Sequence, residues 1–192
     1  MILIAALGAG LLVGLGGARW RGLAYQPPDL KYLWLVFVAF LPQFAAFYLP
    51  EGRQSVSGFL LPFSQALLLG FAWLNRRLPG MMTLLLGAAL NFTVIAANRG
   101  FMPISPQTAS HLVPQTVLEN IQPGERFGTK DILLLPQDTR FEWLADRFLP
   151  PAWSAYQVAF SLGDVLIAAG IFWLLAFQGL SHKNLYQRGT KI

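Results

Sequence analysis

Apolar residues along this chain gather into five long stretches, separated by short polar segments and by one longer one. The stretches are Met1–Gly17, Leu33–Pro50, Gly58–Leu74, Gly80–Ala97 and Gln157–Leu180. A helix rises about 1.5 Å per residue, so about 20 residues cross the ~30 Å hydrocarbon core of a bilayer. The pattern predicts an all-α membrane protein with five transmembrane helices, forming a single domain over residues 1–192.

The longest polar segment, residues 99–156, separates the fourth and fifth stretches and is called the cap below. Its parts Ala109–Ile121 and Thr139–Leu149 are expected to form short helices, the second lying at the membrane interface with its apolar residues on one face. The apolar run Ile132–Leu135 between them needs burial. We expect a folded cap over one end of the helices, or a docking surface.

Cations are divided unevenly among the polar segments. The first, third and C-terminal segments hold eight Lys and Arg residues and one acid, whereas the second segment and the cap hold six cations and seven acids. Lys and Arg near the ends of spans mark the cytoplasmic side of a membrane. The N-terminus is therefore predicted outside, the C-terminus inside and the cap extracytoplasmic. The first stretch has no basic residues before it, which favours a retained helix over a cleaved signal peptide.

Small residues recur every four positions in the first stretch, at Ala6, Gly10, Gly14 and Ala18. In lipid such a stripe lets two helix backbones approach closely. A contact within the bundle is the favoured interpretation, and a contact with another subunit is the alternative.

Proline interrupts the second and third stretches at Pro42 and Pro62, each followed closely by a glutamine, Gln43 and Gln65. Proline frees a backbone carbonyl that neighbouring groups must satisfy. Paired, proline-broken helices mark substrate sites in some transporters. Local repair by the glutamines, or a bridge from each glutamine to a neighbouring group, explains the same residues without a ligand and is the favoured interpretation.

Asp164 is the most informative single residue, because it lies about a third of the way into the fifth stretch. A charge at that depth costs on the order of 3 kcal/mol, so it should face protein, water or a cation. One interpretation is a proton relay, an ion site or a ligand-positioning carboxylate. The favoured one is a structural hydrogen bond or ion pair with Asn98, Arg99 or a loop amide, since the five stretches hold no second acid.

Four uncharged polar residues are candidates to line a cavity with Asp164, namely Asn91, Gln43, Gln65 and Ser161. Single Asn and Gln residues in membrane helices more often form hydrogen bonds between helices. Only their position in space distinguishes a cavity from separate structural contacts.

Other candidate chemistry is sparse. His111 lies in the cap and His182 follows the fifth stretch, so the predicted topology places them on opposite sides and gives no shared haem or pigment site. A Ser/His/Asp triad has no route to assembly. The absence of cysteine excludes thiolate ligands and a Cys nucleophile. No cofactor is assigned, and the expected partners are membrane lipids and integral membrane subunits rather than nucleic acid.

Two short motifs carry a resemblance. The run Asn91–Pro106 reads Asn-x-x-Val-x-Ala-x-Asn-Arg-Gly-x-Met-Pro and then Ile-Ser-Pro, and the last stretch contains Ser161-x-Gly163-Asp164. Together they resemble an uncharacterised family of small bacterial multi-pass membrane proteins, a domain of unknown function. Members more often carry Asn-Gly-Gly, so Arg99 adds a cation here and a candidate partner for Asp164. The resemblance implies a fold and a bacterial cytoplasmic membrane, implies no activity, and suggests one local site around Asp164.

Two functional hypotheses follow. The first is a non-catalytic integral membrane subunit or scaffold of a larger bacterial inner-membrane complex, such as an energy-transducing one. The second is a small transporter or a binder of a lipophilic ligand, such as a quinone or a lipid, with its site between Pro42, Pro62, Asn91 and Asp164. An enzyme needs at least two convergent reactive groups, and the sequence offers one.

Overall fold

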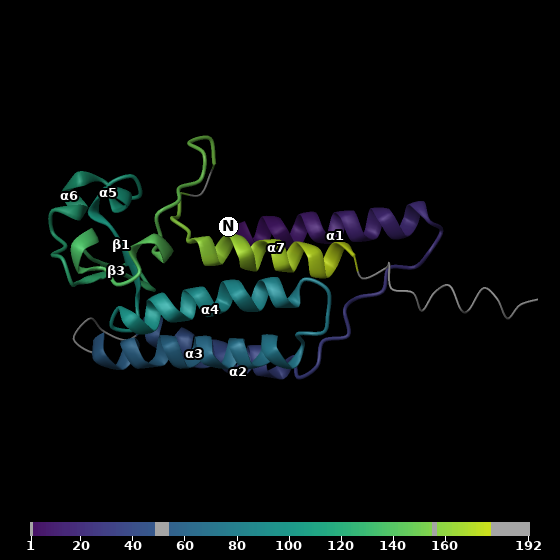
Figure 1. Cartoon of the computed structure of the whole chain (residues 1–192). Coiled ribbons are helices and arrows are strands. Elements are labelled where there is room, and N and C mark those ends of the chain that lie inside the picture. Colours follow the sequence, from purple (N-terminus) through teal and green to yellow (C-terminus); the bar gives the residue numbers. More distant parts are fainter. Residues whose placement is uncertain (1, 49–53, 155–156, 178–192) are drawn as a thin grey trace, which may run out of the picture.

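The computed structural model describes residues 2–48, 54–154 and 157–177, and it is mostly helical (Figure 1). Five long helices follow the predicted apolar stretches, and the polar segment after the fourth folds into a small cap. The long helices are α1 (Ile2–Trp20), α2 (Trp34–Tyr48), α3 (Gln54–Leu74), α4 (Met81–Ala97) and α7 (Leu162–Ala176).

These helices stand in an open row. The extensive contacts join α1 to α7, α7 to α4, α4 to α3 and α3 to α2, so α7 and α4 occupy the middle although they are distant in sequence. The cap lies at one end of the row, beyond the end of α4 and the start of α7 (Figure 1). A row of this kind leaves both faces of most helices without a neighbour. Large apolar side chains are accordingly exposed, including Phe37 (68%), Leu41 (67%) and Phe59 (69%).

Glycines seven residues apart line the contact between α4 and α7. A Cβ on Gly87 would lie 2.5 Å from the Gly163 carbonyl oxygen, and a Cβ on Gly170 would lie 2.6 Å from the Leu84 nitrogen. Gly80, just before α4, faces the backbone of Gly170 in the same way. Because real Cβ atoms almost never approach other atoms so closely, only glycine permits this backbone distance.

The small-residue stripe of α1 faces α7. Gly10, Gly14 and Ala18 are buried, and Ala6 is half-buried. A Cβ on Gly10 would lie 3.0 Å from the Phe172 carbonyl oxygen, and one on Gly14 would collide with the Leu175 carbonyl. The stripe therefore serves a contact inside the chain.

Both predicted prolines lie inside helices, Pro42 in α2 and Pro62 in α3. The polar group next to the first break is a serine rather than a glutamine: the Ser64 hydroxyl donates to the Ala39 carbonyl at 2.7 Å. The same hydroxyl lies 3.4 Å from Oε1 of Gln43, which accepts from it. Ser64 thus donates to a carbonyl in the turn before Pro42, a proline that removes one backbone donor from the helix.

The cap contains a three-stranded sheet in the order β1-β3-β2, with β1 (Met102–Ile104) parallel and β2 (Arg126–Phe127) antiparallel to β3 (Asp131–Leu133). Successive residues of a strand point to opposite faces. Ile132 and Leu134 pack on Ala46 of α2 and Leu61 of α3, while Leu133 packs inside the cap. Burial on both faces explains the continuous apolar run found in the sequence.

The helical parts of the cap are shorter than the sequence pattern suggests. They are α5 (Pro106–Ala109), α6 (Gln115–Leu118) and the 3-10 turns η2 (Pro136–Asp138) and η3 (Glu142–Leu144). Pro114 divides the first predicted segment, because the residue before a proline avoids helical geometry. A helix over Thr139–Leu149 does not form: Phe141 is left-handed (φ 57°) and Ala145 is extended, which leaves one 3-10 turn between them.

Two helices, Ile2–Trp20 and the Val56–Leu74 part of α3, are long and apolar enough to cross a membrane by length and composition. Three further apolar helices are shorter, spanning Trp34–Ala46, Met81–Ala97 and Leu162–Ala176. The last is shorter than its sequence stretch because the helix begins at Leu162 rather than Gln157.

Replacing Gly87 by alanine tests the α4–α7 seam. The added methyl group meets the backbone of Gly163 and Ile167, so we expect a loss of about 1–3 kcal/mol of unfolding free energy, measured by SDS titration in mixed micelles. Gly70→Ala is the matched control, since nothing lies within 4 Å of its Cβ position in α3. Equal effects of the two substitutions would contradict the assigned seam.

Candidate functional site

Ser161 and Asp164 build the start of α7. The Asp164 N–H donates to Ser161 Oγ (3.1 Å), and the Ser161 N–H donates to Asp164 Oδ2 (3.2 Å), which makes a capping box. This reciprocal pairing satisfies two backbone donors that a helix start leaves free. Asp164 therefore lies in the first turn of α7, not a third of the way into a helix as the apolar pattern suggested.

Asn91 of α4 completes the same cluster from the neighbouring helix. Its Nδ2 donates to Asp164 Oδ1 at 2.8 Å, and its Oδ1 accepts from Ser161 Oγ at 2.8 Å. Gly163 makes room for this side chain, since a Cβ there would collide with Asn91 Oδ1. The Ser-x-Gly-Asp motif thus has a local explanation: a cap, a space for Asn91 and the carboxylate that binds it.

The other predicted members of the site lie elsewhere. Asn98 is buried at the end of α4, where Nδ2 donates to the Arg140 carbonyl (2.8 Å) and Oδ1 accepts from the Arg140 N–H (2.9 Å). Gln43 contacts Ser64, and Gln65 is half-buried on α3. Within residues 2–48, 54–154 and 157–177, no ion pair joins Arg99 to Asp164.

This arrangement divides the proposed site. Asn91, Ser161 and Asp164 come together, whereas Pro42 and Pro62 belong to α2 and α3, which α4 separates from α7. No single pocket between the prolines and Asp164 follows from the described helices.

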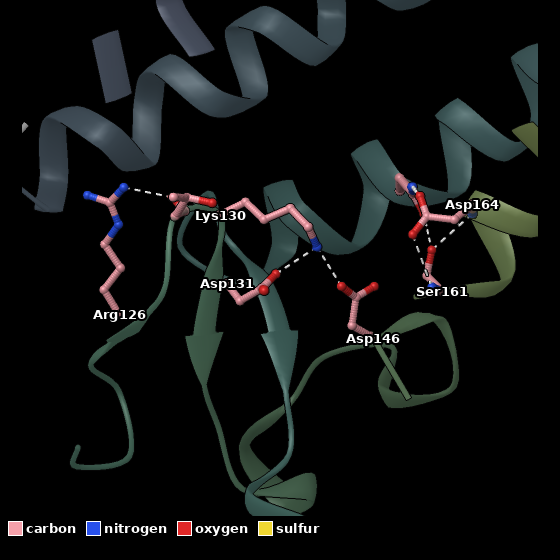
Figure 2. Close-up of polar contacts among 8 residues, drawn as sticks. Arg126, Lys130, Asp131, Asp146, Ser161 and Asp164 are labelled. Atoms are coloured by element: carbon pink, nitrogen blue, oxygen red, sulfur yellow. Dashed lines mark hydrogen bonds and ion pairs between the residues drawn. The ribbon is translucent and has the colours of Figure 1, made fainter. Parts of the chain in front are cut away.

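A second cluster, which the sequence analysis did not identify, lies in the cap beside the first (Figure 2). Lys130 Nζ lies 2.8 Å from Asp131 Oδ1 and 2.5 Å from Asp146 Oδ2. The side chain of Asp146 is 1% exposed, that of Asp131 17% and that of Lys130 37%. One ammonium group therefore pairs with two carboxylates, one of which is fully buried.

Burial and the charge of Lys130 shift the pKa values of the two carboxyl groups in opposite directions. Burial raises the pKa of Asp146 to about 7, although Lys130 lowers it, and the negative charges of Asp131 and Asp164 add to the rise. Burial likewise raises the pKa of Asp131 against the pull of Lys130. Burial opposes the charge of Lys130, but the two carboxylates outweigh it and raise the lysine pKa.

Arg126 ties the cap to α2. Its Nη2 donates to the Ala46 carbonyl (3.0 Å) and to the Thr129 carbonyl (2.7 Å), and its guanidinium lies over the Phe101 ring at 5.7 Å. Carbonyls in the last turn of a helix lack intrahelical partners, so a cation there is favourable. Ser57 of α3 donates to the same Ala46 carbonyl at 3.3 Å.

The described residues form no group of three or more His, Asp or Glu side chains arranged to hold a metal ion. His111 lies exposed in the cap, and His182 lies outside the described residues. An apolar groove runs between α1 and α7, has a volume of about 660 Å³ and is open to the surface. Small residues line much of it, flanked by Phe172, Trp173 and Phe177.

The sequence carried only part of the signal for the second cluster. Lys130, Asp131 and Asp146 all belong to the charges of the cap, and Asp146 falls within Thr139–Leu149, the predicted helix that does not form. The hydrophobic run directly after Asp131 was the available sign, because charges at the start of a buried strand need partners. Asp146, distant in sequence, could not be paired with them from spacing.

A family model described as a family of unknown function (DUF5317) matches residues 28–176. The match covers α2 to α7 and includes both polar clusters. No curated protein and no solved structure matches the chain.

Asn91→Ala tests whether the first cluster holds α4 to α7. The change leaves Ser161 Oγ without its acceptor and Asp164 Oδ1 without its donor, so we expect a loss of about 2–4 kcal/mol of unfolding free energy. Thr93→Ala is the control, since Thr93 is exposed on the same helix and bonds only within it; we expect less than about 0.5 kcal/mol. Denaturation in mixed micelles measures both, and an Asn91 effect as small as the control would refute the role.

Proposed function

We propose, from the premise that the chain belongs to the DUF5317 family of unknown function, that it is a non-catalytic integral membrane subunit or scaffold within a larger bacterial inner-membrane complex. In this proposal all five long helices cross the membrane. The N-terminus lies outside, the C-terminus lies in the cytoplasm, and the cap faces the extracytoplasmic side.

The end of the row opposite the cap supports this orientation. Trp20, Trp34 and Trp73 lie at helix ends there and are 93%, 60% and 55% exposed. Trp side chains concentrate at membrane interfaces, and Lys and Arg mark the cytoplasmic one. The cations of the same end are Arg19, Arg21, Lys31, Arg76 and Arg77. The Arg76 guanidinium carbon lies 4.4 Å from the centroid of the Trp73 ring, so a cation and an aromatic side chain are in contact at this end.

The open row of helices is the observation that carries the scaffold proposal. Its helices contact neighbours on one or two sides only, and large apolar side chains on the remaining surface have no partner within the described residues. The buried polar side chains in the helices bond one another or nearby carbonyls, as Asn91, Ser161 and Ser64 do. The described helices present wide apolar faces, which suits a subunit that packs against lipid and other membrane helices.

The groove between α1 and α7 favours a second candidate, a carrier or binder of a lipophilic molecule such as a quinone or lipid. Its lining includes Val165, the residue after Asp164, and is almost wholly apolar. A volume of about 660 Å³ is within the ordinary range for small-molecule sites. Its open side suits an occupant that enters from the bilayer.

Native mass spectrometry of the chain, extracted gently from its own membrane, separates the two candidates. We expect additional polypeptides in fixed stoichiometry with the chain. The same purification from cells that do not produce the chain should not yield these polypeptides. A lone chain that carries a bound small molecule would favour the binder instead. A lone chain without either would contradict both proposals.

Single cysteines test the orientation, because the chain has none of its own. Gln137→Cys lies in the cap and Gln26→Cys lies at the opposite end, and both positions are exposed. In spheroplasts we expect a membrane-impermeant maleimide to label the first variant within minutes and the second only after lysis. The reverse order would overturn the proposed topology.

A further inference from the structure

Asp146 is the one fully buried charged side chain among the described residues. Its Oδ2 accepts from Lys130, whereas its Oδ1 is buried and has no hydrogen-bond donor within the described part of the chain. That second oxygen points to the side of Ser161 and Asp164 (Figure 2). A buried carboxylate oxygen without a donor favours the neutral, protonated acid, because desolvation penalises the charge.

The charge balance around Asp146 points the same way. Lys130 is shared with Asp131, and Asp164 adds a third negative charge that acts on both carboxyl groups. One cation cannot neutralise three carboxylates. A neighbouring carboxylate favours the protonated form of a carboxyl group, whereas the shared cation opposes it.

Among the described residues, no further charged side chain faces Asp146 from the elements around it. β1 packs against it through the Ile104 bridge and contributes only apolar side chains, and Arg147 is directed to Glu142 at 3.5 Å. α4 contributes Asn91, which is uncharged and bound to Asp164. The groups that determine its protonation are therefore Lys130, Asp131 and Asp164.

We propose that Asp146 is a proton-binding site where the cap joins α7. The ligand is a proton from water: binding forms an O–H bond at the unpaired carboxyl oxygen and removes one negative charge from the cluster, and release restores that charge. This inference does not depend on the proposed scaffold role.

The backbone connects this charge to both the sheet and α7. The Asp146 N–H donates to the Pro103 carbonyl at 3.1 Å, which attaches its segment to β1. Two residues later Phe148 pairs with Phe160, immediately before the Ser161 cap of α7. A change in charge at Asp146 thus acts on the short connection that positions α7.

Infrared difference spectroscopy of the full chain in lipid nanodiscs detects the proton directly. With the pKa at about 7, the protonated fraction falls from about nine-tenths at pH 6 to about one-tenth at pH 8. We expect a carboxylic C=O band that decreases about tenfold over this range and is absent in Asp146→Asn. The control Asp138→Asn removes an exposed carboxyl group of the cap and should leave the band unchanged.

The thermal midpoint gives a second readout. The folded state raises the pKa of Asp146 above the ordinary 3.8, so its contribution to stability is present below about pH 4 and is lost as pH rises through about 7. We expect the temperature of half-unfolding of the native chain to decrease as pH rises from 5 to 8. Asp146→Asn should remove most of that decrease. Asn mimics the neutral acid, so this variant should fold.

Three results would overturn the proposal. The first is the absence of any carboxylic band that titrates between pH 6 and 8 in the native chain. The second is a band that survives Asp146→Asn at full intensity, which would place the proton on another residue. A midpoint independent of pH in the native chain would equally exclude linkage between the proton and the fold.

Discussion

The contact between α4 and α7 holds the molecule together, because α7 is the neighbour that joins α1 to the other helices. Glycines at Gly87, Gly163 and Gly170 let the two backbones meet, and the Asn91–Ser161–Asp164 hydrogen bonds close the seam at the cap end. In a low-dielectric environment these polar groups have few alternative partners. Close backbone packing at the glycines and the side-chain hydrogen bonds near the cap therefore both hold α4 against α7.

The cap depends on this seam and on the ends of the other helices. Arg126 reaches the last turn of α2, and Asn98 at the end of α4 binds both backbone groups of Arg140. Each contact uses a backbone group that a helix end or a turn would otherwise leave unsatisfied. Apolar packing of β3 on α2 and α3 completes the attachment, so a cap without long helices of its own has a defined position.

The charged groups at the two ends of the helices differ in their surroundings. Cations with aromatic neighbours gather at the end opposite the cap, where Arg76 contacts Trp73. The cap holds acids and cations in nearly equal number, and there Asp131 and Asp146 share Lys130. The first distribution suits a fixed orientation in a bilayer, and the second creates a site whose charge responds to pH. The two roles are compatible, since they occupy opposite ends of the helices.

The sequence by itself determined the elements that follow from local pattern. Apolar stretches placed the five long helices, the four-residue rhythm placed Gly10 and Gly14 on a packing face, and the apolar run Ile132–Leu135 required burial. Resemblance in two short motifs also placed the chain in an uncharacterised family, and the match over residues 28–176 confirms it. These features depend on residues close together in the chain.

Tertiary structure alone decided which distant residues meet. The sequence grouped Asp164 with Asn91 and Ser161 among several candidates, but only the packing of α7 on α4 brings these three side chains together, whereas Asn98 binds Arg140. The Lys130–Asp146 pair could not be predicted from spacing either. The two residues are 16 positions apart, and only the fold of the cap brings Lys130 Nζ within 2.5 Å of Asp146 Oδ2. Spacing along a chain predicts contacts one helical turn apart, whereas contacts between elements depend on how those elements pack.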